Sequence, residues 1–198
     1  MNDKITSSTL WEQAWHLILT HAGQANLAFG TAAVASVGHN GLPRNRTIVL
    51  RAADRQAATL THYTDRRSVK VHELRTNPVL SYLFWDAESQ IQFSAHGPTH
   101  WLPQNQAHRL FEQLPKHSRK AYATTSAPSS PLPAPGTGLP DDWDIRTLAE
   151  TDYAQANFGV LVTRLVYADV LLLDRSGNRR LSAIRSEKDR WTLNWIVP

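Results

Sequence analysis

The chain has 198 residues, 41% of them apolar and 19% charged, a composition typical of a folded globular protein rather than a disordered one. It contains no cysteine, which excludes disulfides, thiolate metal sites and cysteine nucleophiles. The N-terminus shows no signal-peptide pattern, and no apolar run approaches the roughly 18 residues of a membrane helix, so we expect a cytoplasmic protein with no membrane contact. The formal net charge of +4 fits either ordinary surface charge or an anionic partner.

The first predicted element is a helix over about residues 9–22. Thr9 and Glu12 have the spacing of a capping box, in which each side chain bonds a free backbone N–H at the helix start. Apolar side chains then recur at helical spacing, and Gly23 can end the helix. We expect the two tryptophans on this helix to pack into the core.

After this helix the apolar pattern changes to that of extended chain. Residues 28–37 are rich in small and β-branched side chains, and Asn40-Gly41 follows as a hairpin signal because both residue types tolerate positive φ. Residues 47–53 and 59–64 then read as strands on either side of a polar turn. Together these segments predict an antiparallel meander.

The following segments alternate between short helices and strands. A helix over 66–76 ends before a proline, and the strand at 79–85 is almost continuously apolar, so we expect both of its faces to be buried. Residues 90–96 alternate, with Gln92 on the polar face, where it could bond a heterocycle or simply face solvent. The remaining predicted elements are helices at 103–114 and 118–123, a helical segment at 144–156, one long strand or two over 158–173, and strands at 180–185 and 191–197.

A proline-rich stretch interrupts this series. Five of the eleven prolines lie between Pro128 and Pro140, so residues from about 126 to 142 are predicted to form a loop or lid. The pattern gives seven or eight antiparallel strands with a few short helices. Such a chain tends to close into a barrel, because closure removes exposed strand edges. We therefore expect a mainly β fold in one domain over residues 1–198.

The connection between residues 46 and 70 has the clearest chemical pattern. Bases stand at both ends of one strand, and hydroxyls and further cations surround the start of the next helix. Donors, fixed positive charge and a helix N-terminus together suit a dianionic phosphate. The alternative is a solvated basic helix end beside a turn. The residues concerned are Arg46, Arg51, Thr64, Arg66, Arg67, Ser68 and Lys70.

Seven motifs follow one another in an order that is similar to a known family. They are RTIVLR (46–51), HYT (62–64), SVK (68–70), LFWD (83–86), QFSAHG (92–97), LFEQLPKHSRKAYA (110–123) and WTLNWIVP (191–198). This ordered set resembles the pyridoxamine 5'-phosphate oxidase family from about residue 28 onward. The resemblance implies an antiparallel split β-barrel that forms a homodimer with FMN bound at the subunit interface.

The resemblance also implies a cofactor role for ten residues. It places Arg46, Ser68 and Lys70 at the FMN phosphate and ribityl chain, and Ile48, Val49 and Leu50 beside the isoalloxazine ring. It places Arg51 at the pyrimidine end of the ring, Tyr63 and Thr64 on the phosphate side, and Gln92 at the ring edge. Family members often have a second base directly before the lysine; here that position is Val69, and Arg66 or Arg67 could compensate.

The resemblance breaks where the family binds its substrate. Positions that carry Tyr, Arg and Ser in the true oxidase are Leu110, Leu114 and Ser118 here, so a substrate phosphate would meet leucine side chains with its charge unpaired. We therefore expect a divergent subgroup that does not oxidise pyridoxamine phosphate. Lys116, His117 and Arg119 either bind another anion or form an exposed basic helix end. The family's Gln-Ser motif falls near Ala127-Pro128, and its C-terminal Arg-x-His motif falls near Arg180-Leu181-Ser182, without the His.

The leading hypothesis is an FMN-dependent oxidoreductase with an unknown substrate and no assigned catalytic side chain. The alternatives are a non-catalytic FMN-binding or sensing protein, or a split barrel that uses deazaflavin or haem. The histidines show no recognisable metal-ligand spacing, so we expect no metal site. Nucleic-acid binding is not favoured, because the bases do not form one stripe.

Overall fold

The computed structural model describes residues 5–198. Residues 1–4, which belong to the predicted domain span and to the segment without a signal-peptide pattern, lie outside the described part. The prediction of one domain over the whole chain stays a prediction. No helix within residues 5–198 has both the length and the apolarity needed to cross a membrane.

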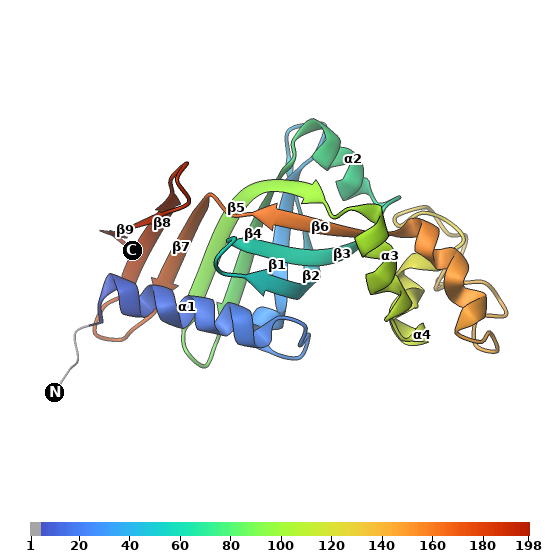
Figure 1. Ribbon diagram of the computed structural model, residues 1–198, viewed down its shortest axis with the longest axis horizontal. Coiled ribbons are helices and arrows are strands. Elements are labelled where there is room, and N and C mark those ends of the chain that lie inside the picture. Colours follow the sequence, from blue (N-terminus) through green and yellow to red (C-terminus); the bar gives the residue numbers. More distant parts are fainter. Residues whose placement is uncertain (1–4) are drawn as a thin grey trace.

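Nine antiparallel strands form the centre of the described part (Figure 1). They are ordered β4-β1-β2-β3-β6-β5-β7-β8-β9, and an additional β4–β5 ladder closes the first six into a barrel. The long strand β5 makes this closure possible, because its first half pairs with β7 and its second half with β6. The strands are β1 (Thr31–Val37), β2 (Pro43–Asp54), β3 (Thr59–Asp65), β4 (Val79–Asp86), β5 (Ile91–Trp101), β6 (Phe158–Arg164), β7 (Tyr167–Leu172), β8 (Arg179–Arg185) and β9 (Trp191–Ile196).

Short helices surround the barrel. In Figure 1, α1 runs below the strands, α2 lies at the top, and α3 and α4 gather at the end away from β7–β9. Two hydrophobic clusters result, one between α1 and the inner sheet face and one around α3 and β6. The helices are α1 (Ser7–His21), α2 (Val69–Thr76), α3 (Gln104–Glu112) and α4 (Lys116–Arg119), with 3₁₀ segments η1 (Ala28–Gly30), η2 (Lys120–Tyr122) and η3 (Ala149–Asn157).

The predicted antiparallel split barrel is confirmed, with one more strand than the upper expectation. The segment 158–173 forms two strands, β6 and β7, because the chain leaves the barrel after β6. Gly97 permits the close crossing at this point. A Cβ atom on Gly97 would lie 1.9 Å from the carbonyl oxygen of Arg164, so only glycine lets β5 pass from one sheet to the other.

The N-terminal helix starts earlier than predicted. It begins at Ser7, and the Thr6 hydroxyl accepts a hydrogen bond of 3.0 Å from the Thr9 backbone N–H. The predicted capping box of Thr9 and Glu12 is therefore wrong: Thr9 is the capped residue, and Glu12 pairs with Arg55. The buried face of the helix consists of Leu10, Trp11, Ala14, Trp15 and Ile18, so the expected packing of both tryptophans is confirmed.

Two further predictions differ from the structure. Helix α2 begins at Val69 rather than at residue 66, because the Asp65 carboxylate accepts from the Arg67 backbone N–H and holds the chain in a turn. Strand β4 is not buried on both faces. Its residues alternate, and Leu83 and Trp85 on the outer face are 42% and 41% exposed. This outer face therefore carries apolar side chains that no part of residues 5–198 covers.

Arg119 is a structural centre of the helical region and not part of an exposed basic helix end. Its side chain is 3% exposed, and its guanidinium donates to the carbonyl oxygens of Leu114 and Leu148 at 3.1 Å and to the Asp152 carboxylate at 2.6 Å. These bonds occupy the guanidinium, which leaves it no donors for an external anion. The hydrogen bonds of the Arg119 guanidinium thus help to hold the segments of the helical region together.

Replacing this cation should unfold the protein more easily. We expect Arg119→Ala to lower the free energy of unfolding by about 3–5 kcal/mol, because buried carbonyl oxygens lose their donors. Urea denaturation measures this change. The exposed Arg109 of α3 provides the control, and Arg109→Ala should stay within about 0.5 kcal/mol of wild type. Equal stabilities of the two variants would contradict the structural role.

Candidate functional site

The candidate site lies where strands β2 and β3 separate. Their ladder runs from the pair Asp54–Thr59 to the pair Leu50–His62, with a register shift at Arg51. Beyond it, residues 46–49 of β2 pair only with β1, and residues 63–65 of β3 pair only with β6. A cavity of about 290 Å³ fills the gap. Alternate backbone groups of β2 face this gap without a partner strand, so a ligand can bond to them.

Eight of the ten residues with a predicted cofactor role line this cavity: Arg46, Ile48, Val49, Arg51, Tyr63, Thr64, Ser68 and Lys70. Leu50 does not, because its side chain is buried in the barrel core and its carbonyl oxygen accepts a bond of 2.8 Å from the Gly23 N–H. Gln92 does not either, since it lies on the outer face of β5 between Trp85 and Leu171. The remaining lining residues are Thr47, Asp65, Ala121, Tyr122 and Pro128.

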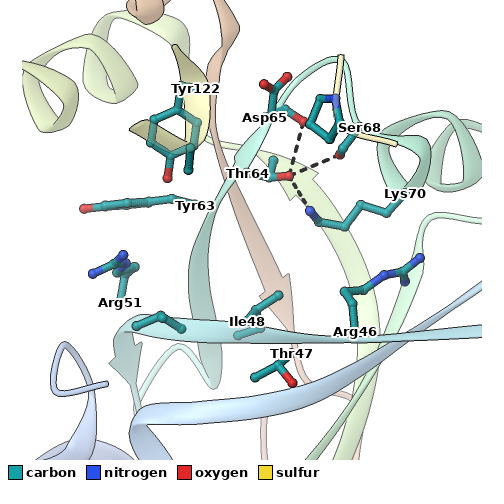
Figure 2. Close-up of a pocket in the computed structure, with 13 residues that line it drawn as sticks. Arg46, Thr47, Ile48, Arg51, Tyr63, Thr64, Asp65, Ser68, Lys70 and Tyr122 are labelled. Carbon is teal, nitrogen blue, oxygen red and sulfur yellow. Dashed lines mark hydrogen bonds between the residues drawn. The ribbon is translucent and has the colours of Figure 1, made fainter. Parts of the chain in front are cut away.

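One end of the cavity is cationic. Figure 2 shows the Lys70 amine pointing toward Thr64, to whose hydroxyl it donates, with the Ser68 hydroxyl 3.4 Å from the same oxygen. Burial, reinforced by the charge of Arg46, lowers the pKa of Lys70 to about 8, although Asp65 and Glu73 act in the opposite direction. The negative charge of a bound anion would counteract both effects and favour the charged amine. This end therefore suits a phosphate.

Behind the cationic end lies Glu73 of α2, which sequence reasoning missed. Its carboxylate is 1% exposed and accepts from the Ser36 hydroxyl at 2.5 Å and from the Arg46 guanidinium at 3.2 Å. Burial raises the pKa of Glu73, but these hydrogen bonds and the charges of Arg46 and Arg44 outweigh it, and the net effect is a lowered pKa. Glu73 could have been found from the sequence, because it lies three residues after Lys70 and therefore on the same face of the helix.

The opposite end combines one cation with two phenols. The Arg51 guanidinium lies 5.2 Å from the centre of the Tyr63 ring and has no ion-pair partner within residues 5–198. Tyr63 lies here and not beside Thr64, because successive strand residues point to opposite sides (Figure 2). Burial raises the pKa of both Tyr63 and Tyr122, so both hydroxyls stay protonated. This end therefore presents one cation and two neutral hydroxyls, which can donate to a ligand.

Tyr122 was missed because nothing near it in the sequence signals a site. It comes from η2 and packs on Phe158 with ring centres 4.8 Å apart, within the second hydrophobic cluster. The helical region therefore contributes a wall to a cavity that the barrel strands open. Such a contribution depends on tertiary packing alone.

A second, polar cavity of about 300 Å³ adjoins the cationic end. It shares Arg46, Ser68 and Lys70 with the first cavity and adds Arg44, Asn45, Val69 and Ser129. Neither candidate for the missing second base lines these cavities. Arg66 lies 4.7 Å over the Trp101 ring, and Arg67 is bonded to Asp65 and Thr124.

His62 is buried inside the barrel and belongs to no metal cluster. Its Nδ1 atom lies 3.2 Å from the Tyr82 hydroxyl, and burial, with the charges of Lys70 and Arg46, lowers its pKa to about 3. The ring is therefore neutral at physiological pH. Within residues 5–198, no group of three or more His, Asp or Glu side chains could hold a metal ion.

Together the two cavities fit a molecule with a terminal phosphate and a flat polar ring. The cations and hydroxyls match the phosphate, the open edge of β2 can bond the middle of the molecule, and Arg51 with the two tyrosines can bond a ring edge. An unpaired cation and a lysine with a lowered pKa in one cavity are features of an anion-binding site. The fold and these cavities define a split barrel of the FMN-binding type.

Comparison with known proteins agrees with this class. Residues 10–103 match the model of the family "Pyridoxamine 5'-phosphate oxidase, FMN-binding domain". A pyridoxine/pyridoxamine 5'-phosphate oxidase of Deinococcus deserti is 32% identical over 99 residues, which are 50% of this chain and 45% of that protein. These matches support a divergent member of the pyridoxamine 5'-phosphate oxidase-like superfamily, most directly for residues 10–103. The matched part of the chain spans about half the length of the curated relatives.

Solved structures share the fold over nearly the whole chain. A pyridoxamine 5'-phosphate oxidase-related, FMN-binding protein from Nostoc punctiforme has a TM-score of 0.73 at 22% identity and covers 94% of this chain and 96% of its own. PhzG from Burkholderia lata, in complex with tetrahydrophenazine-1-carboxylic acid, has a TM-score of 0.68 at 17% identity and covers 100% and 95%. At these identities the likeness establishes the fold alone.

The lowered pKa of Lys70 predicts a pH-dependent affinity for anions. Free Lys70 loses its proton near pH 8, and a bound phosphate group raises its pKa, so affinity is full below about pH 8 and falls as the pH rises above it. We expect a loss of up to about tenfold per pH unit in titrations with FMN between about pH 7.5 and 9.5. Lys70→Arg, which keeps its charge, should give a flat profile. A flat wild-type profile would contradict the assignment.

Proposed function

We propose that this protein binds FMN between β2 and β3 and uses it as an FMN-dependent oxidoreductase. The proposal rests on the two ends of the cavity, which suit the two ends of FMN. Lys70, Ser68 and Arg46 lie at the end that suits the phosphate, and Arg51 and Tyr63 lie at the end that suits the ring. Family membership supports it, because the family match covers the strands that line this cavity. A terminal phosphate and a ring that gains negative charge on reduction need cations at both of these places.

The chain's own residues would bind and orient the cofactor, which supplies the hydride or electron chemistry when bound. Lys70, Arg46 and the hydroxyls of Thr64 and Ser68 would hold the phosphate. The free backbone edge of β2 at residues 46–49 would bond along the molecule. Arg51 would lie against the pyrimidine end of the ring and stabilise its reduced form, while the protonated tyrosines exclude water from that end. No side chain is assigned as a catalytic acid or base.

The substrate is not expected to be pyridoxamine phosphate. Leu110 and Leu114 pack against the second hydrophobic cluster and do not line the cavity. Arg180 is engaged by the Asp169 carboxylate at 2.9 Å, and Pro128 stands where the family has a polar side chain. Of these positions only Arg180 carries a cation, and its Nε is bonded to the Asp169 carboxylate. We therefore expect a different small molecule as the substrate.

A second copy of the chain would complete the site. Thr47 and Val49 line the cavity and pair with Ala33 and Thr31 on β1, so they share the outer face with Leu83 of β4, which pairs with Ala33. The cavity thus borders the exposed apolar face. Gln92 lies on the same face, far from its own cavity, and in a homodimer it would reach the FMN of the other subunit.

A visible absorption spectrum of the purified protein, before and after incubation with FMN and desalting, tests the proposal directly. We expect near-stoichiometric retention of FMN, followed by bleaching of the flavin absorbance with a suitable reducing substrate. Retention without bleaching by any compound in a broad screen would favour the non-catalytic alternative. A protein that retains no FMN but retains deazaflavin or haem would refute the cofactor assignment.

The phosphate end can be tested by substitution. We expect the double variant Lys70→Ala/Arg46→Ala to bind FMN about 100-fold to 10,000-fold more weakly, because two charge-assisted contacts of about 1.5–3 kcal/mol each are lost. Fluorescence titration measures the affinity. Arg109→Ala, which removes an exposed cation outside both cavities, is the control and should bind normally. Normal affinity of the double variant would refute the phosphate assignment.

The dimer has its own test. We expect Leu83→Arg to give monomers in analytical ultracentrifugation and to lose most of the bound FMN, because a charge would be buried against the partner's apolar face. Ile145→Arg, at a loop residue that is 85% exposed, is the matched control and should change neither property. A monomeric wild-type protein that retains FMN would contradict a shared site.

A further inference from the structure

We propose that Arg44 is a phosphate-binding residue of this site and that buried Glu73 positions Arg44 and Arg46 around the phosphate. This inference rests on the proposed binding of FMN. Family members often have a second base directly before the lysine, at the position of Val69 in this chain. The inference assigns the role of that base to Arg44, which lies on β2 and not on α2. It also gives a role to a buried carboxylate in a site that otherwise binds an anion.

Glu73 bridges the two arginines. Its Oε1 atom lies 3.4 Å from the Arg44 guanidinium and its Oε2 atom lies 3.2 Å from that of Arg46. The Ser36 hydroxyl donates to the same Oε2 atom, so the carboxylate itself is fixed. Arg44 and Arg46 are two residues apart on β2 and therefore point to the same side of the strand. One carboxylate thus lies between the two guanidiniums: it accepts a hydrogen bond from Arg46 and holds Arg44 at ion-pair distance.

Arg44 is the available cation of the polar cavity. It lines that cavity together with Arg46 and Lys70, and its side chain is 56% exposed, so most of its donors remain free. Glu73 is its one ion-pair partner within residues 5–198. Arg67 is already saturated by Asp65 and Thr124 and cannot take this role without breaking those bonds.

The charges around the cavity match a phosphate monoester. Three cations, Arg44, Arg46 and Lys70, face one carboxylate, Glu73, which leaves a net charge of +2. Asp65 does not change this sum, because Arg67 neutralises it at 2.7 Å. A phosphate monoester carries about −1.5 to −2 charges at neutral pH. The ring and ribityl chain carry no such charge, so Arg44 contributes to binding of the phosphate only.

Riboflavin, which lacks the phosphate, separates this role from a general effect on the fold. We expect Arg44→Ala to weaken FMN binding by about tenfold to 100-fold and to leave riboflavin binding unchanged, because one charge-assisted contact to the phosphate is lost. Arg44→Lys should recover part of the loss. Arg75→Ala, at an exposed cation of α2 that lines neither cavity, is the control and should bind both flavins normally.

A double-mutant cycle tests the positioning by Glu73. Glu73→Gln keeps the size of the side chain but removes its charge, so the guanidiniums lose their fixed direction. We expect the FMN loss caused by Arg44→Ala to be several-fold smaller in the Glu73→Gln background than in wild type. Riboflavin affinity should again be unchanged, which distinguishes positioning from unfolding.

The outcomes separate this inference from the proposed function. If wild type binds FMN and Arg44→Ala binds it equally well, the role of Arg44 is refuted while the proposed function stands. Independent effects of the two substitutions would refute the positioning by Glu73. If wild type retains no FMN, both the proposed function and this inference fail.

Discussion

The separation of β2 from β3 after the pair Leu50–His62 determines the rest of the site. The register shift at Arg51 ends their ladder, so each strand continues with only its other neighbour. Alternation along β3 then sends Thr64 toward Lys70 and Tyr63 toward Arg51, which gives the cavity two chemically different ends. A continuous ladder would leave neither the free backbone edge nor the gap. The cavity is thus a consequence of strand pairing and not of side-chain size.

The site concentrates positive charge in a partly buried cavity, which is energetically unfavourable without a ligand. Lys70 and Arg46 repel one another, and their charges add to the effect of burial, which lowers the pKa of His62 and keeps its ring neutral. Glu73 compensates for part of this repulsion, but a full set of compensating carboxylates would cancel the attraction for an anion. The structure therefore keeps an unbalanced charge, which weakens the protein without ligand and strengthens ligand binding. Stability and function are in direct competition at these few residues.

Much of the barrel could be predicted from local patterns. The Asn40-Gly41 turn and the alternation of β5 residues indicate neighbouring strands, and the structure pairs them as expected. The prediction that both faces of β4 are buried in the core was wrong, because a strand with apolar residues on both sides can face either a core or another protein. At the site, period-two alternation could not exclude Leu50, because Ile48, two residues before it on the same face of β2, lines the cavity. Glu73 and Tyr122 could not be found this way, because tertiary packing alone brings them to the cavity.

The boundary of the family match divides the site into two parts with different constraints. The match ends at residue 103, so it includes the cations and the open edge of β2 but not Tyr122 or the proline-rich loop that provides Pro128. Strand pairing fixes the first part, since moving Arg46 or Arg51 would require a new register. The second part rests on a separate hydrophobic cluster and can change without disturbing the barrel. On the proposed function, a change of substrate with the same cofactor can therefore arise from changes in the wall that lies beyond residue 103.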